Sequence, residues 1–352
     1  MCYYIKRIGH QESGSVIEGG TPNRGRYIYI SKSPQALAFF PPLSEDIDNH
    51  ASIVPVIPLN FQNPQRVYCS YVYNNSRHSR QQENGRDEYR LYLNHSLFFQ
   101  EGDIVIFKMD RDNITAPHCN DNEDEVGNNP IHALFIYHCN DRGSALYNQC
   151  SQILNTNYLP WGQNRHAIFN DPLPEVEEHI QAITGNIAEN YTPEVDDTVI
   201  NTITGPNVTN IEALFTSQTM FRDFVLTGYN FECAITHNVI RYNNLYNLEA
   251  AHIMPRSHGG TFIPSNGIAL SQDLHWAFDQ GMFYIDDDYN VIVHPHMMDG
   301  YLRQFDHQQI FIPTNPFFRP APESLSYHRE NVFGLFEHSA SLRNAPGYRG
   351  NR

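Results

Sequence analysis

The chain has 352 residues, of which 23 are Lys or Arg and 39 are Asp or Glu, so its formal net charge is −16. Its 40% of hydrophobic and 18% of charged residues are typical of a globular protein, and its length allows two or three domains of roughly 100–200 residues each. This composition excludes collagen-like and repeat architectures. No run approaches the roughly 18 apolar residues that cross a bilayer, so we expect a chain without membrane association.

The N-terminus and the cysteines bear on the compartment in which the protein works. The opening MCYYIKRIGHQESG lacks the apolar stretch of a signal peptide. The 6 cysteines include no C-x-x-C pair, and in a chain of this length such scattered cysteines are typical of reduced thiols. We therefore expect a cytoplasmic protein.

The acidic charge is unevenly distributed along the chain. Residues 1–110 carry 11 basic and 11 acidic side chains, a net charge of 0, whereas residues 151–230 carry 2 and 10, a net charge of −8. Only three of the basic residues are lysines, so most cations are arginines with planar, forked donors. The total charge argues against a nucleic-acid partner, because phosphates bind basic surfaces, but the neutral N-terminal third removes that objection.

Between residues 26 and 140 the sequence predicts strands. Six short segments rich in β-branched and aromatic residues are bounded by Gly, Pro, Asn or Asp. They are RYIYI (26–30), SIVPVIPL (52–59), RVYCSYVY (66–73), YRLYL (89–93), DIVIFKM (103–109) and HALFIYH (132–138). Six strands without long helical periods predict a closed or half-closed β-barrel, which forms an N-terminal domain over residues 1–155.

The rest of the chain predicts helices and then a mixed region. Residues 156–210, with the acidic segments PLPEVEEH and TPEVDD, are typical of a solvated connector with short helices. Apolar residues at spacings of three and four predict a helix over 211–228, with Gly228 as its C-terminal stop. A strand–loop–strand–helix pattern, a hairpin and a C-terminal wrap follow. The expected fold class is α+β, and the third domain spans 211–352.

One stretch of this third domain carries residues suited to chemistry. AAHIMP predicts a short strand with His252 on one face, and Asn266 opens a second strand, GIAL. The helix that follows places His275 and Asp279, four residues apart, on one face. A His/Asp pair at that spacing can provide half of a divalent-metal site, and a histidine from the facing strand can act as a general base.

These segments resemble the HNH, or ββα-metal, endonuclease family. LEAAHIMP matches the family's opening, SNGIAL its middle and LHWAFDQG its close, and the resemblance covers about residues 230–300. It implies that His252 is the general base that deprotonates the attacking water, and that Asn266 holds the loop that orients this base. It also implies that His275 and Asp279 bind one metal ion, Mg²⁺ or another divalent cation such as Mn²⁺. The products would carry 5′-phosphate ends.

One position departs from the family pattern. Many members place an acidic residue or a second histidine directly before the general base, where this chain has Ala251. Glu249, two residues earlier on the same strand face, is open to either a metal-binding or a structural role. Fewer protein ligands leave more water on the ion, which Mg²⁺ tolerates. On the metal-binding helix, Trp276 and Phe278 are expected to anchor the core.

The N-terminal domain offers a second resemblance. NGRDEYRLYLNHSLFFQEGDIVIFKM is similar to a motif of the DNA-binding pseudobarrel shared by restriction-enzyme effector domains and plant transcription factors. The resemblance covers about residues 20–140 and implies that arginine-bearing loops enter the major groove. An unrelated β-barrel that contacts proteins is the alternative. The residues expected to contact DNA are Arg24, Arg26, Lys32, Arg77 and Arg80 in these loops and Arg256 beside the nuclease motif.

These observations favour a DNA endonuclease of the restriction type, directed to double-stranded DNA by its N-terminal domain. One alternative is a modification-dependent nuclease that reads a modified cytosine, for which a flipped base would need an aromatic pocket. Another is a DNA-binding module with a degenerate HNH fold that does not cleave, for which Ala251 is the support. Cleavage of both strands by chains with one site each favours a homodimer.

Overall fold

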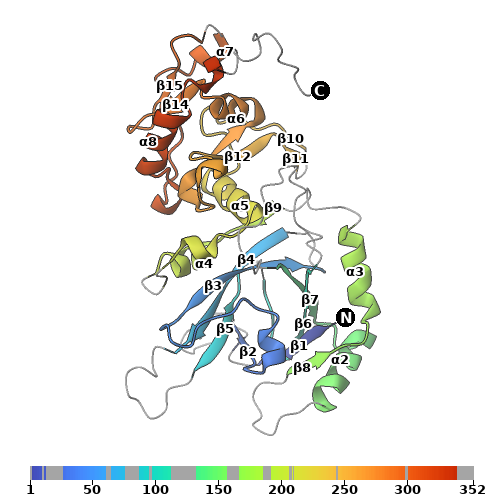
Figure 1. Ribbon diagram of the computed structural model, residues 1–352. Helices are drawn as coiled ribbons and strands as arrows, with labels where there is room; N and C mark the ends of the chain where they lie inside the picture. The colour runs from blue at the N-terminus through green and yellow to red at the C-terminus, as the bar shows by residue number, and fades with distance from the viewer. Residues whose placement is uncertain are drawn as a thin grey trace, which may run out of the picture. The chain divides into compact units, whose positions relative to one another are not determined.

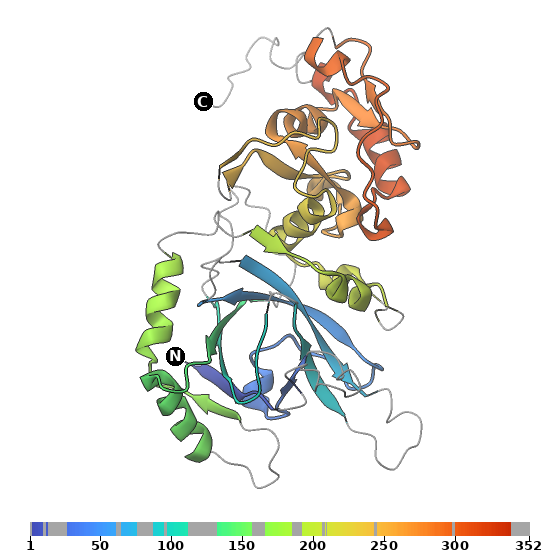
Figure 2. The same cartoon turned by 180° about the vertical axis from the view of Figure 1, so that it is seen from behind.

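The structure is a computed structural model that describes residues 2–9, 12, 27–60, 65–75, 87–94, 97–111, 132–156, 166–184, 192–205, 208, 210–242, 245–297 and 300–338. The described residues divide into two compact units, of which the first ends at Leu214 and the second begins at Phe215. Figure 1 and Figure 2 show the chain from opposite sides. None of the described helices is long and apolar enough to span a membrane.

The first unit is built on one mixed sheet, which has nine strands among the described residues. The strands lie in the order β2-β5-β4-β3-β7-β6-β1-β8, with β9 beside β4. The β3–β7 and β4–β9 pairs are parallel, and the other pairs are antiparallel. The strand bounds are β1 (Tyr3–Arg7), β2 (Tyr27–Ile30), β3 (Ala51–Pro58), β4 (Gln65–Asn74), β5 (Glu88–Tyr92), β6 (Ile104–Met109), β7 (Leu134–Cys139), β8 (His166–Phe169) and β9 (Thr192–Glu194).

The six strand segments that the sequence predicts are confirmed as β2 to β7, whereas its pattern does not predict β1, β8 or β9. Lys6 interrupts the apolar pattern of β1, yet this lysine is fully buried and its ammonium group lies 2.9 Å from the carboxylate of Glu12. A buried charge of this kind requires such a partner. Strands β8 and β9 have only 4 and 3 residues, too few for a recognisable alternation.

The sheet curls into a half-barrel (Figure 1), the open one of the two expected forms, and its end strands β2 and β8 do not pair with each other among the described residues. The acidic segment 156–210 differs from the expected connector, because it supplies β8, β9 and helices α3 (Pro174–Thr184) and α4 (Asp197–Ile203) to the first unit. Its acids are partners of the sheet: Glu177 of α3 lies 2.7 Å from Lys108 of β6.

Apolar side chains pack on both faces of the sheet. One cluster joins the strands to α1 (Pro34–Leu37) and to Phe39 and Phe40, which follow it. The other lies between the strands and helices α2 (Ala145–Thr156) and α3, which flank the sheet in Figure 1. The short η2 (Glu212–Leu214) closes the unit. Burial on both faces explains why β3 is a continuous apolar run rather than an alternating one.

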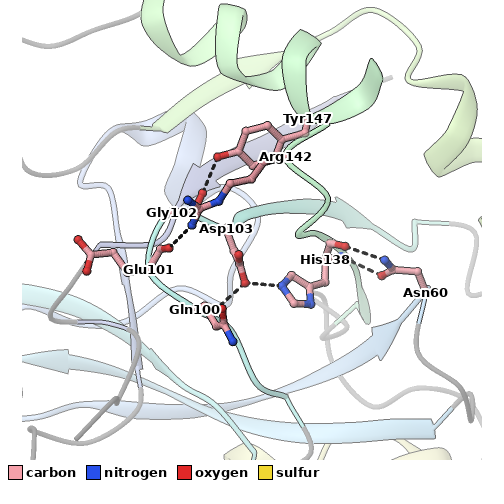
Figure 3. A network of polar contacts seen from close by, with 8 residues as sticks. All are labelled: Asn60, Gln100, Glu101, Gly102, Asp103, His138, Arg142 and Tyr147. Atoms are coloured by element: carbon pink, nitrogen blue, oxygen red, sulfur yellow. Dashed lines mark hydrogen bonds and ion pairs between the residues drawn. The ribbon is translucent and has the colours of Figure 1, made fainter. Parts of the chain in front are cut away.

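A polar network joins β6, β7 and α2 (Figure 3). The buried carboxylate of Asp103 accepts a backbone N–H at 2.8 Å and lies 2.7 Å from His138 Nε2. Asn60 brackets the backbone of His138, accepting its N–H at 2.9 Å and donating to its carbonyl at 2.6 Å. Tyr147 of α2 donates to the carbonyl of Gly102 at 2.9 Å. The bonds to Asp103 satisfy its buried carboxylate, and the bond from Tyr147 joins the start of β6 to α2.

The second unit contains a ββα arrangement and the segments around it. Strands β12 (Leu248–His252) and β13 (Gly267–Ser271) pair antiparallel, and helix α6 (Gln272–Asp279) follows β13 directly. A short hairpin, β14 (Phe283–Ile285) and β15 (Val291–Val293), comes next. The other elements are α5 (Gln218–Gly228), β10 (Arg241–Tyr242), β11 (Leu245–Tyr246), η3 (Arg256–His258), η4 (Pro264–Asn266), α7 (Gly300–Arg303), η5 (Pro316–Phe318) and α8 (Pro322–Asn331).

The helix expected over 211–228 is shorter than predicted, because α5 begins at Gln218. Ser217 has an extended backbone, and its side chain accepts a backbone N–H three residues later at 3.2 Å. Such a cap fixes the start of a helix even where apolar spacing continues before it. The helix ends at Gly228, as the sequence predicts.

A buried histidine links the stability of the second unit to pH. His328 of α8 is 2% exposed and stacks on Phe278 with ring centroids 3.8 Å apart. Burial lowers the pKa of His328 from 6.5 to about 4. The unfolded chain therefore binds this proton more tightly than the folded chain. The stability contributed by neutral His328 is complete above pH 6.5 and is lost as the pH falls from 6.5 towards 4.

We expect the free energy of unfolding to fall through His328 by up to about 1.4 kcal/mol per pH unit within this window. Urea denaturation of the full chain at about pH 7, 6 and 5, with wild type and His328→Gln in parallel, measures this contribution. The variant keeps a donor for the carbonyl of Phe278 but cannot titrate, so it should lose less stability over the same interval. An equal pH dependence in the two proteins would contradict the prediction.

Candidate active site

The three sequence segments that resemble the nuclease family meet within the ββα arrangement. His252 ends β12 and lies opposite Gly267, the first residue of β13, in the strand register. Because α6 begins directly after β13, His275 and Asp279 of this helix return towards β12. The residues that the sequence predicts as base and metal ligands are therefore carried on adjoining elements.

His252 is a half-buried histidine whose ring is held between aromatic side chains. It stacks on Phe221 of α5 with ring centroids 3.9 Å apart and planes 12° apart, and Phe262 lies 5.8 Å away. Its Nε2 is buried without a hydrogen-bond partner among the described residues. Burial, with a contribution from the charge of Arg256, lowers the pKa of His252 from 6.5 to about 3. The imidazole is therefore neutral near pH 7, as a proton acceptor must be.

A glycine permits this stack. A Cβ atom on Gly267 would lie 2.8 Å from the ring of Phe221 and 2.4 Å from Val225, both on α5. A larger residue opposite His252 would push α5 away and would displace the ring on which the histidine rests. Gly267 therefore helps to set the orientation of the imidazole through Phe221.

Asn266 holds the loop that follows His252. Its buried side chain accepts the backbone N–H of Met254 at 2.9 Å and donates to the carbonyls of Met254 and Thr261, each at 3.1 Å. Its backbone carbonyl accepts the N–H of Ile253 at 2.9 Å. Only a side chain with both a donor and an acceptor can make this set of bonds. The geometry suits the loop-pinning role that the resemblance implies.

Arg256 lies in the same loop, beside the proposed base. Its Cζ is 4.0 Å from the ring centroid of Phe262, and its guanidinium donates to the carbonyl of Gly260. Gly260 has no room for a side chain, since a Cβ atom would lie 1.9 Å from the carbonyl oxygen of Met254. Arg256 is close enough for its charge to lower the pKa of His252. The close-packed loop thus places a cation next to the imidazole.

His275 lies between two carboxylates. Its Nδ1 donates to Glu249 Oε2 of β12 at 2.6 Å, and its Nε2 lies 3.3 Å from Asp279 Oδ2 on the same helix. The hydrogen bond from His275 is the main cause that lowers the pKa of Glu249, and the charge of Arg222 lowers it further. The structure thus places Glu249 in one cluster with His275 and Asp279.

This donor set fits a divalent cation. Imidazole nitrogen and carboxylate oxygen are ligands of such ions, and His275 and Asp279 offer one of each from a single helix face. Glu249 accepts the hydrogen bond of the other ring nitrogen of His275, Nδ1. A carboxylate in this position fixes the tautomer and orientation of a metal-binding histidine. Ala251 is fully buried, and its methyl side chain provides no metal ligand at the position before His252.

The remaining residues predicted to contact DNA are mostly outside the described structure. Lys32 is exposed just before α1. The other two lysines are engaged within the first unit, Lys6 with Glu12 and Lys108 with Glu177. The predicted contacts that lie outside the described residues are Arg24, Arg26, Arg77 and Arg80.

The two aromatic residues of α6 differ from each other. Phe278 is fully buried, as the sequence predicts, but Trp276 is 56% exposed, so the prediction that it anchors the core is wrong. The buried face of α6 is taken by Leu274, Ala277 and Phe278, which leaves Trp276 on the outer side. Sequence reasoning does not find Phe221, whose only signal is an apolar position on a helix well before the motif.

The first unit contains a pocket of about 590 Å³ lined by α1, the segment after it, and β4 to β6. The rings of Phe40, Tyr71 and Tyr89 stack in series along it, with centroids 4.8 Å and then 6.0 Å apart. Arg111 and His132 also line the pocket, and His132 Nδ1 is buried without a hydrogen-bond partner among the described residues. Apolar walls with a few polar groups are typical of ligand pockets.

Residues 233–286, which include β12, β13 and α6, match the model of a family described as HNH endonuclease. No curated protein matches the chain. Among solved structures, the chain is similar to one titled "Modification dependent TagI restriction endonuclease", with 22% sequence identity and a TM-score of 0.27. That similarity covers 40% of this chain and 44% of the other, so this chain spans less than half of its length.

Proposed function

We propose that the chain is a DNA endonuclease of the restriction type, because residues 233–286 match the HNH endonuclease family. In this proposal it hydrolyses phosphodiester bonds with His252 as general base and one divalent metal ion. The observation that carries the proposal is the neutral, stacked His252 at the end of β12, on the strand that also brings Glu249 to His275 of α6.

His252 accepts the proton of the attacking water. Its stack on Phe221 and the loop pinned by Asn266 restrict its rotation, so the acceptor is oriented before the substrate binds. A phosphodiester bound beside it raises its pKa towards the working pH, because a nearby negative charge favours the imidazolium. Arg256 is suited to bind that phosphate through its forked donors.

His275 and Asp279 hold the ion, for which we propose Mg²⁺ or Mn²⁺. When bound, such an ion supplies stabilisation of the negative charge on the scissile phosphate and the leaving 3′-oxygen. Glu249 keeps the ring of His275 in place by accepting its Nδ1–H. Attack in line with the leaving oxygen gives 5′-phosphate and 3′-hydroxyl ends.

Glu249→Gln tests this positioning role. The amide can still accept the N–H of His275 but is neutral, so we expect the cleavage rate to fall by about 10–100-fold and the Mg²⁺ requirement to rise. The rate of nicking of supercoiled plasmid, measured against Mg²⁺ concentration, checks this. Glu232→Gln is the matched control, because Glu232 is an exposed carboxylate 3.8 Å from His237. Equal rates for the two variants would contradict the role of Glu249.

The first unit selects the DNA in this proposal. Its contacts are the exposed Lys32 and the arginines of the predicted loops, which position the duplex through phosphates and read bases in the major groove. Two chains with one nuclease site each would cut both strands as a homodimer. The proposed loop contacts are Arg24, Arg26, Arg77 and Arg80.

The aromatic pocket of the first unit favours a second form of this function, in which cleavage requires a modified cytosine. A base turned out of the duplex stacks on aromatic rings, and polar groups read its edge. The rings of Tyr71 and Tyr89 and the polar groups of Arg111 and His132 supply both kinds of contact.

Digestion of matched plasmids separates the two forms. One plasmid carries unmodified cytosine and the other 5-methylcytosine or 5-hydroxymethylcytosine, each with Mg²⁺. Cleavage of unmodified DNA supports the first form, and cleavage of modified DNA alone supports the second. Arg111→Ala, at an exposed wall residue, should then weaken the discrimination. Cleavage of neither plasmid would overturn both.

A further inference from the structure

A second group of metal-binding side chains lies outside the cluster around His275. His294, His296 and Glu337 each bring one ligand atom to within 4.8 Å of the other two. Within the described part of the chain, this is the one group of three His, Cys, Asp or Glu residues with that geometry. None of the three lies in the segment 233–286 that matches the nuclease family.

The ring of His294 is held by aromatic side chains, with its Nδ1 beside the other two residues of the group. It packs against Phe333 and Phe336, with ring centroids 4.9 Å and 5.0 Å away. The backbone N–H of His296 donates to His294 Nδ1 at 3.2 Å, which leaves this nitrogen unprotonated. The same Nδ1 lies 4.0 Å from Glu337 Oε1. An ion bound between these two atoms would take the Nδ1 lone pair in place of the long hydrogen bond from His296, and a neutral imidazole is the form that binds metal.

The other two residues of the group, His296 and Glu337, are exposed to solvent. His296 Nδ1 contacts Glu337 Oε1, and their side chains are 73% and 41% exposed. An exposed pair of this kind contributes little to stability on its own. Its position beside the lone pair of the more buried His294 is what distinguishes it from an ordinary surface pair.

Hydrogen bonds from one arginine hold the backbone of the turn that carries both histidines. Pro295 lies between them, and Arg303 of α7 donates to the carbonyls of Pro295 and Met297 at 2.6 Å and 2.8 Å. It also donates to the carbonyl of His294 at 3.2 Å. These bonds hold the backbone from which both histidine side chains project.

The segment that carries Glu337 is held by the end of α6. The N–H of Gly334 donates to the carbonyl of Gly281, and the N–H of Phe336 donates to the carbonyl of Gln280, each at 2.8 Å. These bonds hold the backbone of the segment after α8 from which Glu337 projects. The three proposed ligands therefore come from two segments that are distant in sequence.

The geometry points to a zinc-class site formed by His294, His296 and Glu337, with a fourth position open to water. Ligand atoms at about 2.0–2.2 Å from a tetrahedral Zn²⁺ lie roughly 3.3–3.6 Å apart. His294 Nδ1 and Glu337 Oε1, 4.0 Å apart, would therefore move slightly closer, and His296 would move away from Glu337 as the ion replaces their direct contact. Two imidazoles favour Zn²⁺ over Mg²⁺. The ion ties the segment after α8 to the end of β15. This inference is independent of the proposed nuclease function.

Zinc binding by the full chain tests the site. His275→Ala, which removes the proposed catalytic ligand, serves as the parent protein, and its metal-free form is dialysed against Zn²⁺ and assayed for metal. We expect one Zn²⁺ per chain and a rise in melting temperature with Zn²⁺, since a ligand of the folded state stabilises it. Adding His296→Ala or Glu337→Gln should weaken binding by at least about tenfold and abolish the temperature shift.

The controls separate binding from folding. His296 is largely exposed, so in EDTA the His296→Ala chain should melt at the temperature of its parent. His237→Ala removes a histidine that faces a single carboxylate, Glu232, at 3.8 Å and should leave zinc binding unchanged. A parent that binds no Zn²⁺, or zinc binding that survives both His296→Ala and Glu337→Gln, would overturn the proposal.

Discussion

His252→Ala is expected to lower the rate of plasmid cleavage by about 10²- to 10⁴-fold, the usual contribution of a positioned general base. The imidazole is neutral at the working pH and is held by Phe221, so its removal takes away an acceptor that water cannot replace in the same orientation. The initial nicking rate at saturating Mg²⁺ measures this loss. DNA binding, measured with EDTA present, should persist.

His237→Ala is the matched control for this variant, since it removes a half-exposed histidine from the same unit. Because His252 also packs on Phe221, the melting temperature of His252→Ala is compared with that of wild type to exclude unfolding. A folded His252→Ala chain that cleaves as fast as His237→Ala would remove His252 as the base. A non-cleaving DNA-binding module predicts that neither protein cleaves.

His275→Ala is expected to lower cleavage by at least about 10³-fold, because a bound divalent ion supplies several kcal/mol of charge stabilisation. His275 contacts the carboxylates of both Glu249 and Asp279, so its loss removes the side chain that links them. Cleavage rates across a Mg²⁺ and a Mn²⁺ titration measure the effect, and excess metal should not restore the wild-type rate.

The comparison with His296→Ala makes this result specific. Both variants remove a histidine that faces a carboxylate, but His296 belongs to the separate group with His294 and Glu337. His296→Ala should keep its Mg²⁺-dependent cleavage. A His275→Ala chain with an unchanged rate and Mg²⁺ dependence would contradict the assignment of the catalytic metal to α6.

The sequence predicts those parts of the fold whose pattern is local. The strands β2 to β7 are dense in β-branched and aromatic residues, and each is bounded by turn residues. The pattern does not predict β1, because Lys6 is buried through an ion pair with Glu12 that no local pattern indicates. It also assigns the acidic α3 to a solvated connector, although Glu177 is a partner of Lys108 in the sheet.

The candidate site also depends on contacts between separate elements, which the local sequence pattern does not show. Spacing and family resemblance make His252, Asn266 and His275 candidates for the site, because these residues lie close together in sequence and form an ordered motif. The ring of Phe221 beneath His252 comes from a separate helix, and its role depends on packing through Gly267. The contact of Glu249 with His275 depends on how β12 packs against α6, which the sequence alone does not show.

The chemistry of the ends that the wild-type chain leaves on plasmid DNA tests the proposed hydrolysis most directly. We expect cleavage that requires Mg²⁺ or Mn²⁺ and is lost in His252→Ala. We also expect 5′-phosphate and 3′-hydroxyl ends that a ligase joins without prior kinase treatment. Metal-independent cleavage, or ends that carry a 3′-phosphate, would contradict it.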